Sequence, residues 1–300
     1  MLDTIISNIR QQTVLDLIKS GIAQNEASIE ADILIEHIFG LSKKDLIVNP
    51  DQEAPKNLVN EFNNLVQKRI NEKIPIQYLV KKASFMGYKF YVDENVLIPR
   101  PETEILVQEV LKLINISQNK NLSIIDVGTG SGCIACMFAL NLISNCHPEL
   151  VSGSNNYKII ASDISEKALA VAKINAKKLG ILDKIQFIHS DILSDIDKNF
   201  DFIVSNPPYI PIKDQESLQI EVSGYEPHLA LFVDDEKGIS FYKKLIKQSQ
   251  AKLNKNSYLA VEIGISQSQY ISGLLQEAGF ANIKVIKDLS DIDRVIIASK

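Results

Sequence analysis

The chain has 300 residues, of which 45% are hydrophobic, and its 32 Lys and Arg residues against 37 Asp and Glu residues give a net charge of −5. At roughly 150 residues per domain, this length predicts about two domains, and the apolar content is ample for a sizeable core. The acidic balance argues against a nucleic-acid substrate, because proteins that neutralise phosphates usually carry a basic surplus.

The sequence predicts neither a membrane span nor a secretory signal. No stretch reaches the ~18 uninterrupted apolar residues that a membrane span needs. The first residues, MLDTIISNIRQQ, contain Asp3 and Arg10 where a signal peptide would have a basic start followed by an apolar run. We therefore expect a cytoplasmic protein without a membrane partner.

The first 74 residues contain only helical patterns. Apolar residues at helical spacing predict two helices that end near Gly21 and Gly40. Two further helices are predicted after Ser42 and after Pro55, the second of them longer and amphipathic. Residues 1–74 are thus expected to form a small helical-bundle domain.

Residues 75–98 have a different pattern and are predicted to form a β-hairpin linker. Ala83–Val92 (ASFMGYKFYV) is rich in aromatic and β-branched residues around Gly87, which suits a hairpin. Asn95–Pro101 is expected to be extended, because each proline disfavours helix in the residue before it.

Residues 99–300 alternate helical patterns with short apolar runs. Glu102–Ile114 is predicted to be an amphipathic helix. The runs that predict strands are Ser123–Val127, Lys158–Ala161, Ile185–His189, Phe200–Ser205, Tyr258–Ile263, Ile283–Lys287 and Val295–Ala298. Alternating strands and helices predict an α/β domain with a mostly parallel, seven-stranded, Rossmann-like sheet that is covered on both faces.

A glycine-rich loop follows the first predicted strand of this sheet. Its sequence is DVGTGSG, and its candidate cofactor-binding residues are Asp126, Gly128, Thr129, Gly130, Ser131 and Gly132. Glycines permit a tight turn that a ligand can approach, and the helix that follows offers free N–H groups. The spacing is G-x-G-x-G and not the G-x-G-x-x-G of dinucleotide sites. This difference favours S-adenosyl-L-methionine over NAD, because the loop then has to pass only a methionine moiety.

Acidic residues follow the next two predicted strands. Asp163 could accept hydrogen bonds from both hydroxyls of a ribose, and Asp191 could accept one from an adenine amino group. Each aspartate alone could equally be a helix N-cap, but three acids in register after successive strands favour a ligand site. Gly132 and Asp163 are 31 positions apart, against about 20 in such folds, so residues 144–156 are predicted to be an exposed insertion.

The three cysteines are too few and too clustered for a disulfide framework. Cys133 and Cys136 form a C-x-x-C pattern inside a predicted helix, which favours buried thiols over a redox pair. Cys146 and His147 lie in the predicted insertion without a second pair of ligands, so no metal site is predicted.

The tetrapeptide Asn206-Pro207-Pro208-Tyr209 ends the fourth predicted strand, where a plain proline turn is the simplest interpretation. After a glycine loop it suggests chemistry on an amide or amine. The Asn206 side-chain oxygen and the Pro207 carbonyl could accept the two hydrogens of an NH2 group, while both prolines fix the backbone. Tyr209 could stack against a planar group. Such a grip would orient the nitrogen toward a methyl group without a general base.

These residues resemble the HemK/PrmC family of protein-(glutamine-N5) methyltransferases. The resemblance covers nearly the whole chain and includes PIQY at 75–78, the FMGYKFYV hairpin, IPRPETE at 98–104, GYEP at 224–227, and EIG at 262–264 with Gln267. It implies that Gly128–Gly132, Asp163 and Asp191–Ile192 bind S-adenosyl-L-methionine. It also implies that Asn206–Tyr209 bind the glutamine of the Gly-Gly-Gln motif of class I peptide chain release factors, and that the helical domain helps to hold this partner.

Two other functions remain open on the sequence alone. A nucleic-acid methyltransferase acting on adenine N6 or guanine N2 would use the same grip on an exocyclic amine after flipping the base. The net charge of −5 and the absence of an extra basic segment argue against it. A non-catalytic module that binds the cofactor or a release factor is the third possibility, and the intact Asn206 argues against that one. Arg100, Glu102 and Glu104 are expected at the edge of the site, with a solvated helix start as the alternative, and the sequence assigns no particular chemistry to them.

Overall fold

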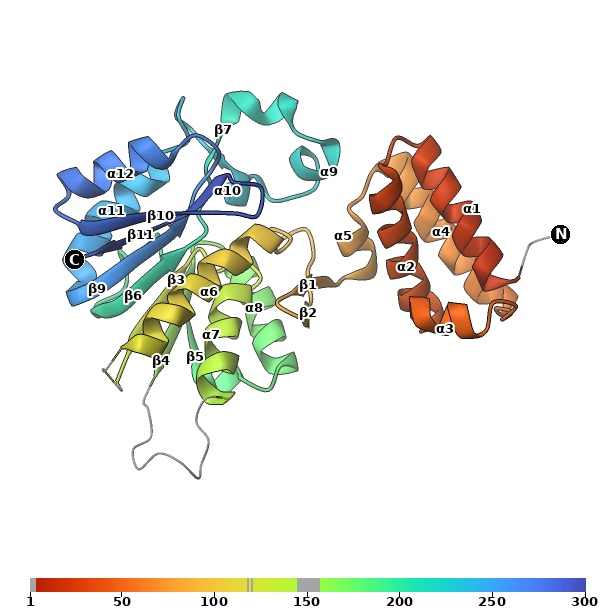
Figure 1. The fold of residues 1–300 in the computed structure, drawn as a ribbon, viewed down its shortest axis with the longest axis horizontal. Coiled ribbons are helices and arrows are strands. Elements are labelled where there is room, and N and C mark those ends of the chain that lie inside the picture. The colour runs from red at the N-terminus through yellow and green to blue at the C-terminus, as the bar shows by residue number, and fades with distance from the viewer. Residues whose placement is uncertain (1–3, 118, 120, 145–156) are drawn as a thin grey trace. The chain divides into compact units, whose positions relative to one another are not determined.

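The computed structural model describes residues 4–117, 119, 121–144 and 157–300. Apart from Ser144, the predicted insertion with Cys146 and His147 lies outside the described residues. The chain divides into two compact units (Figure 1). One comprises the residues up to Lys82 together with Gln219–Tyr225, and the other comprises Ala83–Leu218 and Glu226–Lys300.

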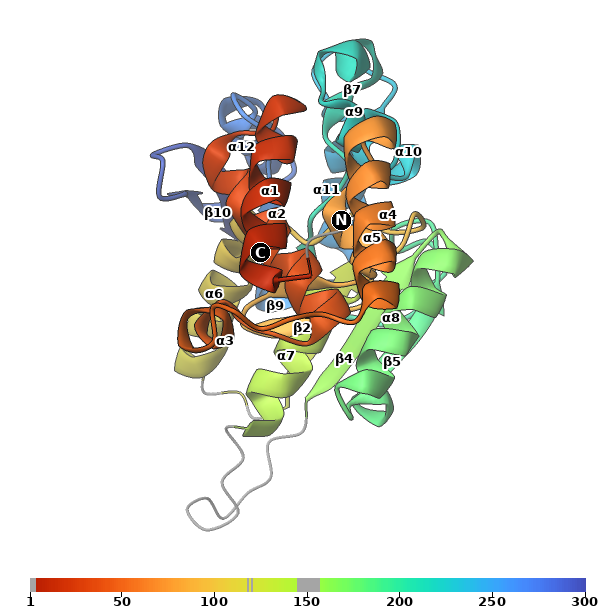
Figure 2. The ribbon, with the colours of Figure 1, turned by 90° about the vertical axis from the view of Figure 1, so that its right-hand side faces the viewer.

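The first unit is helical, as the sequence predicts for this region. Its helices α1, α2 and α4 pack against one another around the buried side chains of Leu34 and Phe62 (Figures 1 and 2). The helices of this unit are α1 (Ile6–Lys19), α2 (Gln24–Phe39), α3 (Lys43–Val48), α4 (Lys56–Glu72), α5 (Ile76–Val80) and α9 (Ile220–Ser223). Helix α5 is not predicted from the sequence, because its buried residues Ile76, Tyr78 and Val80 alternate as they would in a strand.

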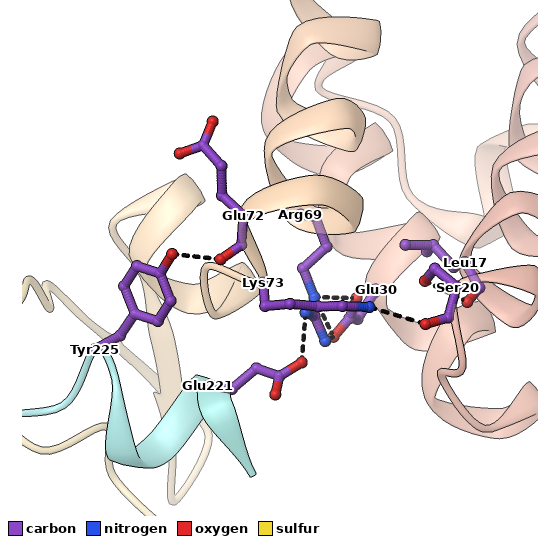
Figure 3. Close-up of polar contacts among 8 residues, drawn as sticks. All are labelled: Leu17, Ser20, Glu30, Arg69, Glu72, Lys73, Glu221 and Tyr225. Atoms are coloured by element: carbon purple, nitrogen blue, oxygen red, sulfur yellow. Dashed lines mark hydrogen bonds and ion pairs between the residues drawn. The ribbon is translucent and has the colours of Figure 1, made fainter.

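A buried ion-pair network holds the segment Gln219–Tyr225 to the helices of this unit (Figure 3). The Arg69 guanidinium donates to both carboxylate oxygens of Glu30, at 2.8 Å and 2.9 Å for the shortest contacts, and to Glu221 at 2.8 Å. The Tyr225 hydroxyl donates to the carbonyl oxygen of Glu72. The Arg69 and Glu30 side chains are only 4% and 6% exposed. Residues far along the sequence therefore complete the helical unit.

The second unit is built on one seven-stranded sheet, which confirms the predicted α/β fold. The strands run in the order β10-β11-β9-β6-β3-β4-β5, and β11 runs in the direction opposite to the other six. They are β3 (Ser123–Val127), β4 (Lys158–Asp163), β5 (Ile185–His189), β6 (Phe200–Ser205), β9 (Leu253–Glu262), β10 (Ala281–Lys287) and β11 (Asp293–Ser299). The predicted runs match six of these strands to within two residues at each end, and β9 begins five residues before the predicted run.

Helices cover both faces of this sheet because successive strand residues point to opposite sides. Ile124 belongs to a core formed with α6 (Pro101–Ile116), α7 (Cys133–Ser144) and α8 (Glu166–Lys178), whereas Ile125 packs with α11 (Ser240–Lys252) and α12 (Ser268–Glu277) (Figure 1). The smaller elements are the 3-10 helices η1 (Leu182–Lys184) and η2 (Ile212–Ser217), the helix α10 (His228–Leu231) and the parallel pair β7 (Ile210–Pro211) and β8 (Phe232–Val233). No helix among the described residues has the length and apolar character needed to cross a membrane.

The predicted hairpin is present as β1 (Ala83–Phe85) and β2 (Tyr88–Phe90). Its two turn residues, Met86 and Gly87, have φ values of 46° and 80°, which is the conformation that a two-residue hairpin turn requires. The Glu104 carboxylate accepts a hydrogen bond from the Met86 N–H at 2.7 Å. Phe85 and Phe90 are buried in the core below α6, so the hairpin packs as part of the second unit.

We expect Arg69→Met to destabilise the helical unit by about 3–5 kcal/mol, because it leaves the Glu30 carboxylate buried without its partner. Native-state hydrogen exchange of the α2 and α4 amides measures this local free energy. Arg10→Met is the matched control, since the Arg10–Asp32 pair is about a quarter exposed and should contribute about 1 kcal/mol or less. Equal losses in the two variants would contradict a structural role for the buried network.

Candidate active site

A cavity of about 470 Å³ lies in the second unit, at the edge of the sheet where β3, β4, β5 and β6 end. Of the residues predicted for the site, Gly128, Thr129, Gly130, Ser131, Asp163, Asp191, Ile192, Asn206 and Pro208 line it. Asp126, Gly132, Pro207 and Tyr209 are not part of the lining. The first group therefore forms part of the cavity wall, and the second lies next to lining residues in the same loops or strands.

The glycine loop is held by backbone hydrogen bonds to β4. The N–H groups of Gly128 and Thr129 both donate to the Ser162 carbonyl at 2.9 Å. Gly132 has a φ of +80°, and a Cβ at this position would lie 2.9 Å from the Cβ of Ala172 on α8. Its glycine is thus required by backbone conformation and by the close packing of α8 against the loop.

Asp126 acts inside this loop and is fully buried. Its carboxyl accepts hydrogen bonds from the Thr129 hydroxyl at 2.5 Å and from the Ala135 N–H at 3.2 Å, while Oδ1 has no partner in the described part of the chain. Burial raises the pKa of Asp126 to about 7, despite those two hydrogen bonds. Asp126, which is predicted to bind the cofactor, lies outside the cavity lining and holds Thr129 and the start of α7 in place.

Asp163 and Asp191 lie on the cavity wall in different environments. The two oxygens of Asp163 accept hydrogen bonds from the Gly130 and Ser165 N–H groups, both at 2.9 Å. Asp191 is exposed, whereas the Ile192 side chain is 5% exposed. Ile192 has a φ of 58°, which is unusual for a β-branched residue and costs on the order of 1–3 kcal/mol. Such strain at a cavity wall is typical of a functional site.

Asn206 is connected to a buried chain of hydrogen bonds. Its side-chain Nδ2 donates to the Thr103 hydroxyl at 3.0 Å, and that hydroxyl donates to the Glu262 carboxylate at 2.6 Å. Thr103 and Glu262 are each 2% exposed. Burial raises the pKa of Glu262 to about 7. The chain joins the start of α6, the end of β6 and the end of β9.

The side chain of Gln267 holds the backbone carbonyl of Tyr209. The Gln267 amide nitrogen contacts the carbonyls of Tyr209 at 3.0 Å and Lys237 at 2.9 Å, and its oxygen accepts from the Gly264 N–H at 2.9 Å. Gly238 has a φ of +70°, and a Cβ there would lie 2.1 Å from the Tyr209 carbonyl oxygen. Burial raises the pKa of Tyr209 well above its usual range, so the phenol stays neutral.

Arg100 and Glu104, which are expected at the edge of the site, have distinct partners. The Arg100 guanidinium, on the cavity wall, donates to Glu226 at 2.6 Å. The other Glu226 oxygen is buried without a partner in the described part of the chain. Burial raises the pKa of Glu226 to about 7. Glu104 instead supports the hairpin turn. The IPRPETE and GYEP motifs thus meet through the hydrogen bond between Arg100 and Glu226.

The thiols of the C-x-x-C pattern are free and buried, as predicted. Burial raises the pKa of Cys133 to about 12, which keeps it protonated at neutral pH. Among the described residues, no three metal-ligating side chains gather into a cluster.

Several residues that shape this site have no role predicted from the sequence: Thr103, Asn175, Gly238, Glu262 and Gln267. Asn175, on α8, donates to the Ser131 carbonyl and to Tyr91 of the segment after the hairpin. Thr103, Glu262 and Gln267 lie in motifs that the resemblance includes, but their function depends on partners far along the chain. Gly238 stands in the sequence as a single glycine outside the motifs named above, so no pattern indicates its role.

We expect Gly238→Ala to destabilise the second unit, by at least about 1–2 kcal/mol from its left-handed backbone alone. The added Cβ must also displace the Tyr209 carbonyl. Gly273→Ala in α12 is the matched control: it meets nothing within 4 Å and should stabilise the protein by up to about 1 kcal/mol. Urea unfolding of both variants checks this, and shifts of the same sign would contradict the packing described for Tyr209.

The raised pKa of Glu226 predicts a pH-dependent stability. Above a pH of about 4.5 the unfolded chain ionises this carboxyl, whereas the folded state keeps it protonated until a pH of about 7. The free energy of unfolding therefore falls as the pH rises from about 4.5 to about 7. Glu226→Gln should therefore reduce the fall in unfolding free energy between pH 5 and pH 7.5, by up to about 3 kcal/mol. Urea titrations at both pH values measure it, and an unchanged fall would show that Glu226 ionises normally.

Two family models match parts of this chain. Residues 9–80 match the PrmC N-terminal domain and residues 102–222 match the methyltransferase small domain. Among solved structures, the hMettl16 catalytic domain in complex with MAT2A 3′UTR hairpin 6 has a TM-score of 0.52 at 15% identity, covering 84% of this chain and 85% of that one. That similarity shows a shared fold.

Curated relatives are much more similar in sequence. A release factor glutamine methyltransferase of Flavobacterium psychrophilum is 38% identical over 97% of this chain and 98% of its own length. The protein of the same name from Clostridium acetobutylicum is 34% identical over 90% of both chains. The chain belongs to the family of release factor glutamine methyltransferases.

Proposed function

We propose that the protein transfers the methyl group of S-adenosyl-L-methionine to the side-chain nitrogen of the Gly-Gly-Gln glutamine in class I peptide chain release factors. The product of the cofactor is S-adenosyl-L-homocysteine. One observation carries the proposal: Val127 of β3 pairs in register with Ser205 of β6. The glycine loop and Asn206 therefore begin at neighbouring points of the sheet edge, and both line one cavity. Family membership supports the same substrate.

The cavity wall suits the chemistry of S-adenosyl-L-methionine. Its carboxylates, Asp163 and Asp191, suit the hydroxyl and amino hydrogens of an adenosine, and the exposed side chain of Ile164 supplies apolar surface beside them. Although both Asp163 oxygens already accept a backbone N–H, each has a second lone pair for a ribose hydroxyl. When bound there, the cofactor supplies an electrophilic methyl group on a sulfonium.

Asn206 and Pro207 are proposed to grip the substrate amide. An amide nitrogen is a weak nucleophile, so its two hydrogens must be held and its lone pair aimed at the methyl carbon. The Asn206 Oδ1 and the Pro207 carbonyl would accept these hydrogens, and Tyr209 would bound the site with its neutral ring. Orientation of this kind can supply up to about 7–11 kcal/mol. As the N–C bond forms and the S–C bond breaks, the nitrogen becomes positive, and its proton then leaves to water.

We propose further that the helical unit contributes to binding of the release factor. Its described residues include the exposed apolar side chains Ile29, Ile47 and Val48, which a protein partner could cover. The net charge of −5 favours a protein over a nucleic acid as substrate. Because translation terminates in the cytoplasm, we propose that compartment for the reaction.

Asn206→Ala should lower kcat for release-factor methylation about 100-fold or more, because it removes one of the two acceptors that orient the nitrogen. Mass spectrometry of the Gly-Gly-Gln peptide, after reaction with S-adenosyl-L-methionine, measures the product. The matched control is Asn199→Ala, an exposed asparagine at the opposite end of the same strand, which should keep the wild-type rate. A wild-type enzyme that leaves the glutamine unmodified would refute the substrate, and full turnover by Asn206→Ala would refute the grip.

A further inference from the structure

We propose that Thr103 and Glu262 are positioning residues that determine which end of the Asn206 amide faces the substrate. This inference deepens the proposed function and rests on it for the identity of the reacting amide. An asparagine side chain presents an acceptor at Oδ1 and donors at Nδ2, and a rotation of the amide exchanges them. The proposed grip works only with Oδ1 toward the substrate, because both ends of a glutamine NH2 group are donors.

The polarity of the chain begins at Glu262. In its ionised form, which prevails above a pH of about 7, the Glu262 carboxylate can only accept hydrogen bonds, so the Thr103 hydroxyl donates its single hydrogen to it over 2.6 Å. The Thr103 oxygen can then only accept from Asn206. The donor at 3.0 Å is accordingly Nδ2, which leaves Oδ1 as the polar atom for the cavity. A single charge at one end thus sets the direction of both hydrogen bonds.

Burial prevents the two hydrogen bonds from reversing their direction. Thr103 and Glu262 are each 2% exposed, so water does not compete for the two hydrogen bonds. A rotated Asn206 would place Oδ1 against the Thr103 oxygen, whose hydrogen is already committed, and the unpaired acceptors would destabilise that rotamer. The charged form of Glu262 is disfavoured by burial and by Glu102, and favoured by Arg294, Arg100 and the Thr103 hydrogen bond. Tyr242 holds the Glu262 backbone carbonyl at 2.8 Å and fixes the end of the strand.

Thr103→Val tests the proposal because valine keeps the shape of threonine and lacks the hydroxyl. We expect kcat for release-factor methylation to fall about 10-fold or more, with little change in KM for S-adenosyl-L-methionine. Thr103→Ser keeps the hydroxyl and should restore most of kcat. Glu262→Gln should lower kcat by a smaller factor, because a glutamine can also donate to Thr103 and the direction is no longer fixed. Wild-type kcat in Thr103→Val would overturn the role of Thr103, and wild-type kcat in Glu262→Gln would overturn that of Glu262.

A second measurement does not depend on the methylation reaction. The side-chain NH2 resonances of Asn206, assigned by their loss in Asn206→Ala, report its hydrogen bond in the ¹⁵N NMR spectrum. We expect these resonances to shift in Thr103→Val and to stay near their wild-type positions in Thr103→Ser. Unshifted resonances in Thr103→Val would overturn the proposal. If the wild-type protein methylates no release factor while the resonances still shift, the substrate assignment fails and the positioning role stands.

Discussion

Everything at the candidate site depends on the parallel pairing of β3 with β4 and β6. Val127 is in register with Ser162 on one side and with Ser205 on the other, so the three strands end at one level. Parallel strands need long crossovers, and these carry the glycine loop, the acidic turn and the Asn-Pro-Pro-Tyr segment to the same edge. A slip of one residue in either pairing would turn every side chain of that strand to the other face. The backbone hydrogen bonds between these strands therefore determine the geometry of the site.

Three buried carboxyl groups surround this edge, and each orients another group. Asp126 binds Thr129 in the glycine loop, Glu226 binds Arg100, and Glu262 binds Thr103. Burial raises the pKa of all three to about 7, so their desolvation works against folding at neutral pH. Two of them also have a buried oxygen without a partner among the described residues. These buried carboxyl groups lower the free energy of unfolding, and they hold the polar groups around them in fixed directions.

The sequence predicts what depends on local pattern. Short apolar runs indicate the strands and the glycine spacing indicates the loop, because both signals lie within a few residues. Helix α5 is not predicted, because buried and less buried side chains alternate along it as they do in a strand. The Asn206–Thr103 and Thr103–Glu262 contacts span 103 and 159 residues, and no local pattern encodes such pairings. The left-handed backbone of Ile192 is likewise imposed by its tertiary surroundings, against the preference of a β-branched residue.

The segment Gln219–Tyr225 has a consequence for the order in which the protein is made. The chain passes from one unit to the other after Lys82, returns for seven residues and leaves again at Glu226. On the ribosome, the helices up to Lys82 emerge first, yet Arg69 has only one of its two carboxylate partners until Glu221 has been synthesised. Strands β3, β4, β5 and β6 are all made before then. The amino-terminal unit, although first in the sequence, can be completed only after four strands of the sheet have left the ribosome.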